Sequence, residues 1–141
     1  MERKMRVFFD TNILLDQLDH RRTGYTVMLE LEPLLSQKGI QPMCAWHSLS
    51  IIEYIGKKVF PAEVIHQILR GITQNYVIPS VGSAEAREAF TYLKDDFEDA
   101  MQIATARAGR ATYIITNDKK FATSPIPVVT SQEFLQILQQ G

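Results

Sequence analysis

The sequence has little of several features that mark particular protein classes. Cys44 is the only cysteine among 141 residues, which excludes an intrachain disulfide and a thiolate zinc site. We therefore expect Cys44 to be a small buried hydrophobe. No apolar run approaches the roughly 20 residues that span a bilayer, and no apolar signal core follows the charged start at residues 1–5. These absences lead us to expect a cytoplasmic protein.

A strong excess of positive charge is also missing. The chain has 15 Lys and Arg residues against 16 Asp and Glu residues, a net charge of −1. It therefore lacks the global positive field of many nucleic-acid-binding proteins, and any contact with nucleic acid has to depend on local basic groups or metal ions. With 45% hydrophobic and 22% charged residues, the composition is that of a soluble globular protein. The length suits a single domain over residues 1–141.

Motifs of several enzyme classes are absent as well. The sequence contains no glycine-rich phosphate loop and no Gly-x-Ser-x-Gly elbow. Phosphatases of the haloacid-dehalogenase type require an Asp-x-Asp motif after the first strand. Here Asn12 occupies the position of the second acid after Asp10. The histidines show no metal-ligand spacing, so we expect surface or core roles for all of them: His20, His47 and His66.

Strand-like and helix-like segments alternate along the whole chain. Runs of apolar and β-branched residues predict strands at 6–9, 42–45, 76–78, 113–116 and 127–129. Amphipathic segments predict helices at about 13–18, 23–37, from a cap at Ser48 or Ser50 to 56, 61–72, 83–93, 96–109 and from 130 or 131 onward. This alternation predicts an α/β fold with a mostly parallel sheet that helices cover on both faces.

Asp10 stands where the first strand ends. Residues 6–9 run without polar alternation, which is typical of a strand buried on both faces. Asp10 then lies at the carboxyl end of that strand, where ligand sites form in open α/β sheets. Asp118 follows the strand at 113–116 in the same way. If the two strands are neighbours, both carboxylates lie at one edge of the sheet; the alternative is that each is a turn acid bonded to its own backbone.

The helix that opens at Asp96 carries a second group of acids. Helical spacing places Asp99 on a row with Ile103 and Ala106, so its carboxylate is flanked by apolar residues. A partly desolvated carboxylate requires a partner or a metal ion. The alternative is that Asp96 and Asp99 are only a helix cap and a first-turn acid. A separate polar row is expected on the solvent side: Glu98, Gln102 and Thr105.

Glu53 permits two interpretations. It lies within an apolar stretch, which places it near the inner face of a helix. Lys57 follows four residues later, so the two side chains equally suit an ordinary surface ion pair worth a few tenths of a kcal/mol. The residues by themselves do not choose between these readings.

The acids together indicate a type of chemistry. Several carboxylates at one sheet edge repel each other, and without cations at least one keeps its proton at neutral pH. Mg²⁺ or Mn²⁺ resolves this conflict because hard cations prefer oxygen ligands. Two such ions can activate water and stabilise the leaving oxygen when a phosphodiester is cleaved. The pattern therefore indicates metal-assisted phosphoryl chemistry.

A series of motifs resembles one known family. The motifs are Asp10-Thr11-Asn12 after the first strand, Glu53 in a mid-chain helix, Asp96-Phe97-Glu98-Asp99-Ala100 and Thr116-Asn117-Asp118. Their order and spacing resemble those of PIN-domain proteins over nearly the whole chain, and most of all bacterial single-domain members of the VapC toxin type. The resemblance implies a three-layer α/β/α fold, an acidic pocket for Mg²⁺ or Mn²⁺, and endonucleolytic hydrolysis of single-stranded RNA.

The resemblance also implies roles for individual residues. The catalytic quartet is Asp10, Glu53, Asp99 and Asp118. Within it the metal ligands are Asp10, Asp99 and Asp118, and the supporting residues are Asn12, Thr116 and Asp96. One departure concerns Lys120, which stands where many relatives carry an acid before the phenylalanine of the last motif. This departure weakens the case for a second metal ion.

Partners follow from the same resemblance. It implies a homodimer and a type II toxin that is held inactive by an antitoxin protein from the neighbouring gene. Two other functions stay open at this point. One is a PIN scaffold that binds RNA or a protein partner without cutting. The other is a DNA nuclease of the flap type, for which the short chain leaves little room.

Overall fold

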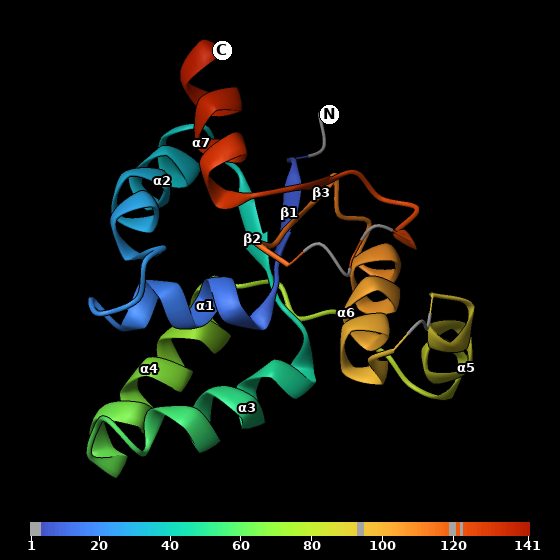
Figure 1. Ribbon diagram of the computed structural model, residues 1–141, viewed down its shortest axis with the longest axis horizontal. Helices are drawn as coiled ribbons and strands as arrows, with labels where there is room; N and C mark the ends of the chain where they lie inside the picture. The colour runs from blue at the N-terminus through green and yellow to red at the C-terminus, as the bar shows by residue number, and fades with distance from the viewer. Residues whose placement is uncertain (1–3, 93–94, 119–120, 122) are drawn as a thin grey trace.

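The computed structural model of the protein describes residues 4–92, 95–118, 121 and 123–141. Lys120 lies outside the described residues. So does residue 93, the predicted end of one helix. In chain order the elements are β1 (Arg6–Phe9), α1 (Thr11–Leu18), α2 (Tyr25–Gln37), β2 (Gln41–Met43), α3 (Trp46–Gly56), α4 (Ala62–Asn75), α5 (Ser83–Tyr92), α6 (Phe97–Ala108), β3 (Tyr113–Ile115), β4 (Val128–Val129) and α7 (Ser131–Gln140) (Figure 1).

The strands form one parallel four-stranded sheet in the order β2-β1-β3-β4. β1 is therefore central, and its neighbour on one side is β3, with Val7 opposite Tyr113 and Phe9 opposite Ile115. Past the end of β1 the pairing continues, because the Asp10 amide donates to the Ile115 carbonyl oxygen at 3.0 Å. The strands that precede Asp10 and Asp118 are thus neighbours, as the prediction of a shared edge required.

Alternate residues of β1 enter different cores. Val7 and Phe9 are fully buried against helices α1, α2 and α7, whereas Phe8 is fully buried with Ile103 of α6 on the opposite face. Figure 1 shows α5 and α6 on one side of the sheet and the remaining helices on the other. The three-layer α/β/α fold is confirmed. Burial on both faces explains why β1 has no polar residue between Val7 and Phe9.

The predicted strand at 76–78 is wrong. Val77 makes only an isolated bridge with Met43, through hydrogen bonds that join its amide to the Pro42 carbonyl and its carbonyl to the Cys44 amide. Pro79 follows two residues later and has no N–H group with which to extend a ladder. The segment therefore touches the edge of β2 and leaves it.

Helix α3 begins earlier than a serine cap predicted. Its first residue is Trp46, and its N-cap is Ala45, whose side chain makes no capping hydrogen bond. Ser48 lies inside the helix and is fully buried. Its hydroxyl oxygen lies 2.7 Å from that of Thr11, so it joins α3 to the start of α1 instead of capping a helix.

Other expectations from the composition concern burial. Cys44 is fully buried, as predicted, and burial raises the pKa of its thiol to about 12. The thiol therefore stays protonated at neutral pH and behaves as a small hydrophobe. Within the described part of the chain, no helix has both the length and the apolar character needed to cross a membrane.

Candidate active site

Asp10 is held rigidly at the end of β1. Its side chain is buried, with 2% of the residue exposed. The Thr116 hydroxyl donates to Oδ2 at 2.7 Å, and the Gln102 amide Nε2 donates to Oδ1 at 3.1 Å. Burial raises the pKa of Asp10, and the hydrogen bonds from Thr116 and Gln102 oppose that rise. Both carboxylate oxygens are thus oriented by partners from other elements.

Asp118 is connected to Asp10 through Thr116. The Thr116 oxygen, which donates to Asp10, also accepts a hydrogen bond from the Asp118 amide at 3.0 Å. One buried hydroxyl therefore joins the two segments at the carboxyl edge of the sheet. The supporting role that the resemblance implies for Thr116 stays a prediction.

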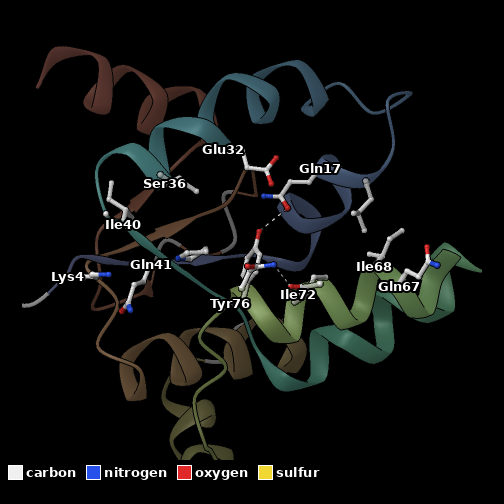
Figure 2. A pocket seen from close by; sticks show the side chains of 16 residues that line it. Lys4, Gln17, Glu32, Ser36, Ile40, Gln41, Gln67, Ile68, Ile72 and Tyr76 are labelled. Atoms are coloured by element: carbon white, nitrogen blue, oxygen red, sulfur yellow. Dashed lines mark hydrogen bonds between the residues drawn. The ribbon is translucent and has the colours of Figure 1, made fainter. Parts of the chain in front are cut away.

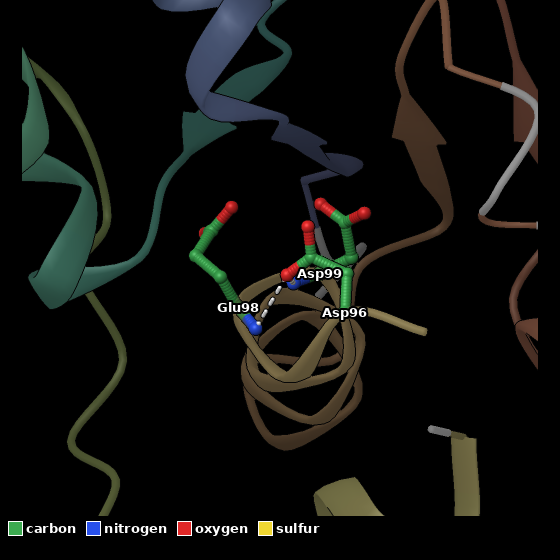
Figure 3. Close-up of side chains that lie close together, drawn as sticks. All are labelled: Asp96, Glu98 and Asp99. Carbon is green, nitrogen blue, oxygen red and sulfur yellow. Dashed lines mark hydrogen bonds between the residues drawn. The ribbon is translucent and has the colours of Figure 1, made fainter. Parts of the chain in front are cut away.

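The first turn of α6 brings three more acids to this edge. Asp96 is the N-cap, and its Oδ1 accepts from the amides of Glu98 at 2.9 Å and Asp99 at 3.3 Å. Each of these three residues offers a carboxylate oxygen, and the oxygens lie within 4.8 Å of one another. Figure 3 shows the three carboxylates on one side of the helix end. We refer to the following set as the acidic cluster: Asp10, Asp96, Glu98, Asp99 and Asp118.

Asp99 is the member of the acidic cluster whose ionised form its surroundings disfavour most. Its Oδ2 is buried and has no hydrogen-bond partner among the described residues. Burial, followed by the charges of Asp96 and Glu98 and then those of Asp10 and Asp118, raises the pKa of Asp99 to about 7. All the other acids of the cluster therefore act on this one carboxylate, which places them within a common electrostatic field.

The acidic cluster fits a hard divalent cation. Its donors are carboxylate oxygens, the ligand type that Mg²⁺ and Mn²⁺ select, and the unpartnered Oδ2 of Asp99 needs a positive partner. A cation there also offsets the mutual repulsion that raises the pKa of Asp99. The carboxylate oxygens that lie within 4.8 Å of one another come from Asp96, Glu98 and Asp99. The charges of Asp10 and Asp118 also act on Asp99.

Cation-free protein is expected to lose stability as the pH rises. The folded-state pKa of Asp99 is raised from its ordinary 3.8 to about 7. The contribution of its protonated form is therefore fully present below the unfolded pKa and is lost as the pH rises through 7. Thermal unfolding in a chelator between pH 4 and 8 measures this trend. The variant Asp99→Asn cannot titrate and should show a flatter profile; identical profiles would contradict the assignment.

The polar row of α6 does not face solvent, and that prediction was wrong. Gln102 is fully buried and Thr105 is 3% exposed. The Gln102 amide nitrogen donates to Asp10 and, at 2.8 Å, to Glu98 Oε2, while its oxygen accepts from the Thr11 amide at 3.1 Å. The row is buried because each of these polar atoms finds a partner on β1, α1 or α6 itself.

The side chains of two residues assigned by resemblance have their described partners outside the acidic cluster, although the backbone amide of Asn12 donates to Asp10 Oδ1 at 3.5 Å. The Glu53 side chain is 50% exposed on α3, and its described ion-pair neighbour is His66 of α4 at 3.9 Å, not Lys57. Asn12 is exposed, and its Oδ1 lies 3.4 Å from a guanidinium nitrogen of Arg22. Their participation in the site stays a prediction.

His47 is a site residue that the sequence did not reveal. Its Nε2 lies 2.7 Å from Glu98 Oε2, and Glu98 in turn accepts from Gln102, which donates to Asp10. A hydrogen-bonded chain thus runs from the first turn of α3 to the end of β1. No local sequence pattern predicts the contact between His47 and Glu98, because these residues are 51 positions apart.

A cavity elsewhere in the molecule has none of the acidic-cluster residues in its lining. It measures about 620 Å³ and is lined by residues of α1, α2, α4 and the start of β2. In Figure 2 the Tyr76 hydroxyl points to Gln17, to whose Oε1 it donates at 2.9 Å. Burial raises the pKa of Tyr76, so this phenol stays neutral. We therefore place the chemistry at the acidic cluster and not in this cavity.

Comparison with known proteins agrees with this geometry. The family model described as PIN domain matches residues 6–120. Ribonuclease VapC1 of Aquifex aeolicus (strain VF5) is 24% identical over 136 residues, which span 93% of this chain and 94% of that relative. VapBC-1 from nontypeable Haemophilus influenzae aligns over 91% of this chain and 99% of that chain, with a TM-score of 0.70 and 13% identity. A toxin-antitoxin complex from Klebsiella pneumoniae aligns over 89% of this chain and 97% of that chain, with a TM-score of 0.63 and 25% identity. Because the matched region covers most of the chain and the folds agree, this protein belongs to the PIN domain family.

Proposed function

We propose that this protein is a metal-dependent endoribonuclease that cleaves single-stranded RNA and acts as the toxin of a type II toxin-antitoxin pair. The observation that carries the proposal is the buried carboxylate oxygen of Asp99, which has no hydrogen-bond partner among the described residues. The charges of all the other acids in the cluster act on this carboxylate. The relative named as a ribonuclease and the solved toxin-antitoxin complex support the choice of substrate and of partner. We also expect the protein to form a homodimer.

Asp10, Asp99 and Asp118 would hold Mg²⁺ or Mn²⁺. When bound, the cation offsets the negative charge of the phosphodiester and increases the acidity of water. The chain's own residues prepare the site: Thr116 and Gln102 orient the two oxygens of Asp10, and the Asp96 cap fixes the first turn that carries Asp99. In the cation-free protein the pKa of about 7 leaves Asp99 partly protonated near neutral pH, and a bound cation would displace that proton.

A cleavage assay on defined RNA tests the enzymatic part of the proposal. We expect purified protein to cut a labelled single-stranded RNA with Mn²⁺ or Mg²⁺ and to leave it intact in excess EDTA. A DNA strand of the same sequence and the RNA annealed to its complement are the matched controls. Binding of RNA without cleavage at millimolar Mn²⁺ would overturn the enzyme proposal in favour of a non-cutting scaffold.

The toxin part has a separate test. Expression of the chain should arrest bacterial growth, and co-expression of a small protein encoded by an adjacent gene should restore it by forming a complex. The Asp10→Asn variant is the control, since it should still form that complex without arresting growth. Growth arrest of equal strength by this variant would separate toxicity from the acidic cluster and contradict the proposal.

A further inference from the structure

Trp46 is a large exposed aromatic side chain that precedes His47 in the sequence. It is the first residue of α3 and the only tryptophan of the chain, and 70% of it is exposed. Helix packing does not explain it, because the residues that α3 buries are Ser48, Ile52 and Gly56. The next residue, His47, contacts Glu98 at 2.7 Å. Trp46 thus stands one residue away from the hydrogen-bonded chain that leads to Asp10.

A small cavity lies against Trp46. Its volume is about 210 Å³, and residues of α3, α5, α6 and the loop before α5 surround it. Its lining residues are Trp46, His47, Val81, Gly82, Glu85, Ala86, Met101 and Thr105. The cavity is smaller than the roughly 300–1,000 Å³ of sites for drug-sized ligands, so it suits a single flat ring system. Its walls are largely apolar, and His47 and Glu85 supply polar groups.

Charge determines what part of an RNA strand this surface can attract. The acidic cluster repels phosphates, and the whole chain has a net charge of −1. At this surface, binding energy that depends neither on a cation nor on local basic groups has to come from the uncharged parts of the strand. Unpaired bases provide it by stacking on exposed aromatic side chains and by hydrogen bonding through their edges.

We propose that Trp46 and the adjoining cavity form a subsite for one unpaired nucleobase of the RNA strand, which stacks on the indole and enters between α3 and α6. The inference rests on the proposed function for the identity of the strand. It accounts for an exposed tryptophan, a cavity of base size and a shared residue, His47, that connects the cavity to the acidic cluster.

The single tryptophan provides a direct reading of base binding that does not require cleavage. In EDTA, we expect adenylate and uridylate RNA pentamers to quench the fluorescence of Trp46 in a saturable manner. The variant Ala86→Leu keeps Trp46 as the reporter and narrows the cavity from an exposed position on α5. It should therefore raise the pentamer concentration needed for half-maximal quenching roughly tenfold. Absence of quenching by every pentamer would overturn the inference and leave this face to a protein partner.

Cleavage kinetics give an independent reading. We expect Trp46→Ala to raise KM for single-stranded RNA roughly tenfold, with little change in kcat, and Trp46→Phe to restore most of the loss. Tyr54→Ala is the matched control, because Tyr54 is an exposed aromatic of the same helix, at 59% exposure, and lies outside the cavity. Equal rises in KM for Trp46→Ala and Tyr54→Ala would overturn the subsite.

The two readings separate this inference from the proposed function. Saturable quenching without any cleavage would contradict the nuclease proposal and support the base subsite. RNA cleavage without quenching of Trp46, and without a rise in KM for Trp46→Ala, would support the nuclease proposal and contradict the base subsite.

Discussion

Cleavage of single-stranded RNA is expected to fall roughly a thousandfold when either Asp10 or Asp99 is replaced by asparagine. The substitution keeps the shape of the side chain and removes the charge that a divalent cation requires. Asp10 is buried with both oxygens hydrogen-bonded, and Asp99 receives the field of every other acid in the cluster. Single-turnover cleavage at saturating Mn²⁺ measures the loss, and Mn²⁺ titration calorimetry should show weakened binding.

Two controls separate the loss of the catalytic charge from a loss of the fold. Asp19→Asn is the matched variant, because Asp19 pairs with Arg21 on the surface and lies outside the acidic cluster. It should cut at the parent rate. Asp99→Asn should also raise the unfolding temperature of the cation-free protein at pH 8, since it removes a carboxylate that its neighbours disfavour. Parent-level cleavage by Asp10→Asn and Asp99→Asn would refute the site.

The same assay decides which glutamate completes the site. Glu53 matches the family pattern but is half-exposed on α3, whereas Glu98 lies within the acidic cluster and bonds to Gln102 and His47. Our proposed quartet predicts a large loss for Glu53→Gln. A loss confined to Glu98→Gln would instead transfer the fourth acidic role to α6.

Gln102→Met is expected to destabilise the protein by about 2–4 kcal/mol and to reduce cleavage by about 10- to 100-fold. Methionine has a similar volume and suits a helix, but it cannot hydrogen-bond in place of the amide. The change removes the Gln102 hydrogen bonds to Asp10 Oδ1, Glu98 Oε2 and the Thr11 amide. Glu98 keeps its contact with His47, but Asp10 Oδ1 keeps only the 3.5 Å hydrogen bond from the Asn12 amide. Urea denaturation gives the free energy of unfolding, and single-turnover kinetics give the rate.

A matched surface substitution separates the loss of these bonds from the loss of an amide. Gln136 is exposed on α7, so Gln136→Met should change the free energy of unfolding by less than about 0.5 kcal/mol and leave cleavage unchanged. If Gln102→Met behaved like Gln136→Met, the hydrogen bonds around Asp10 would have no role in holding the site.

The sequence by itself determined the frame of the site. The unbroken apolar run at 7–9 indicated a strand buried on both faces, and the alternation of strands and helices indicated a parallel sheet. Asp10 and Asp118 then had to lie at the same edge, since parallel strands present their carboxyl ends together. These features depend on local patterns and on a rule of connectivity, so they could be predicted without coordinates.

Only the tertiary structure decided what faces the acids. Helical spacing places Gln102 on a polar row but does not say whether water or Asp10 satisfies it, and Asp10 lies 92 residues away. The same holds for His47 against Glu98 and for the cavity beside Trp46, which unites segments from three helices and a loop. Burial of a polar group depends on whether a distant partner completes its hydrogen bonds, and periodicity carries no information about that partner.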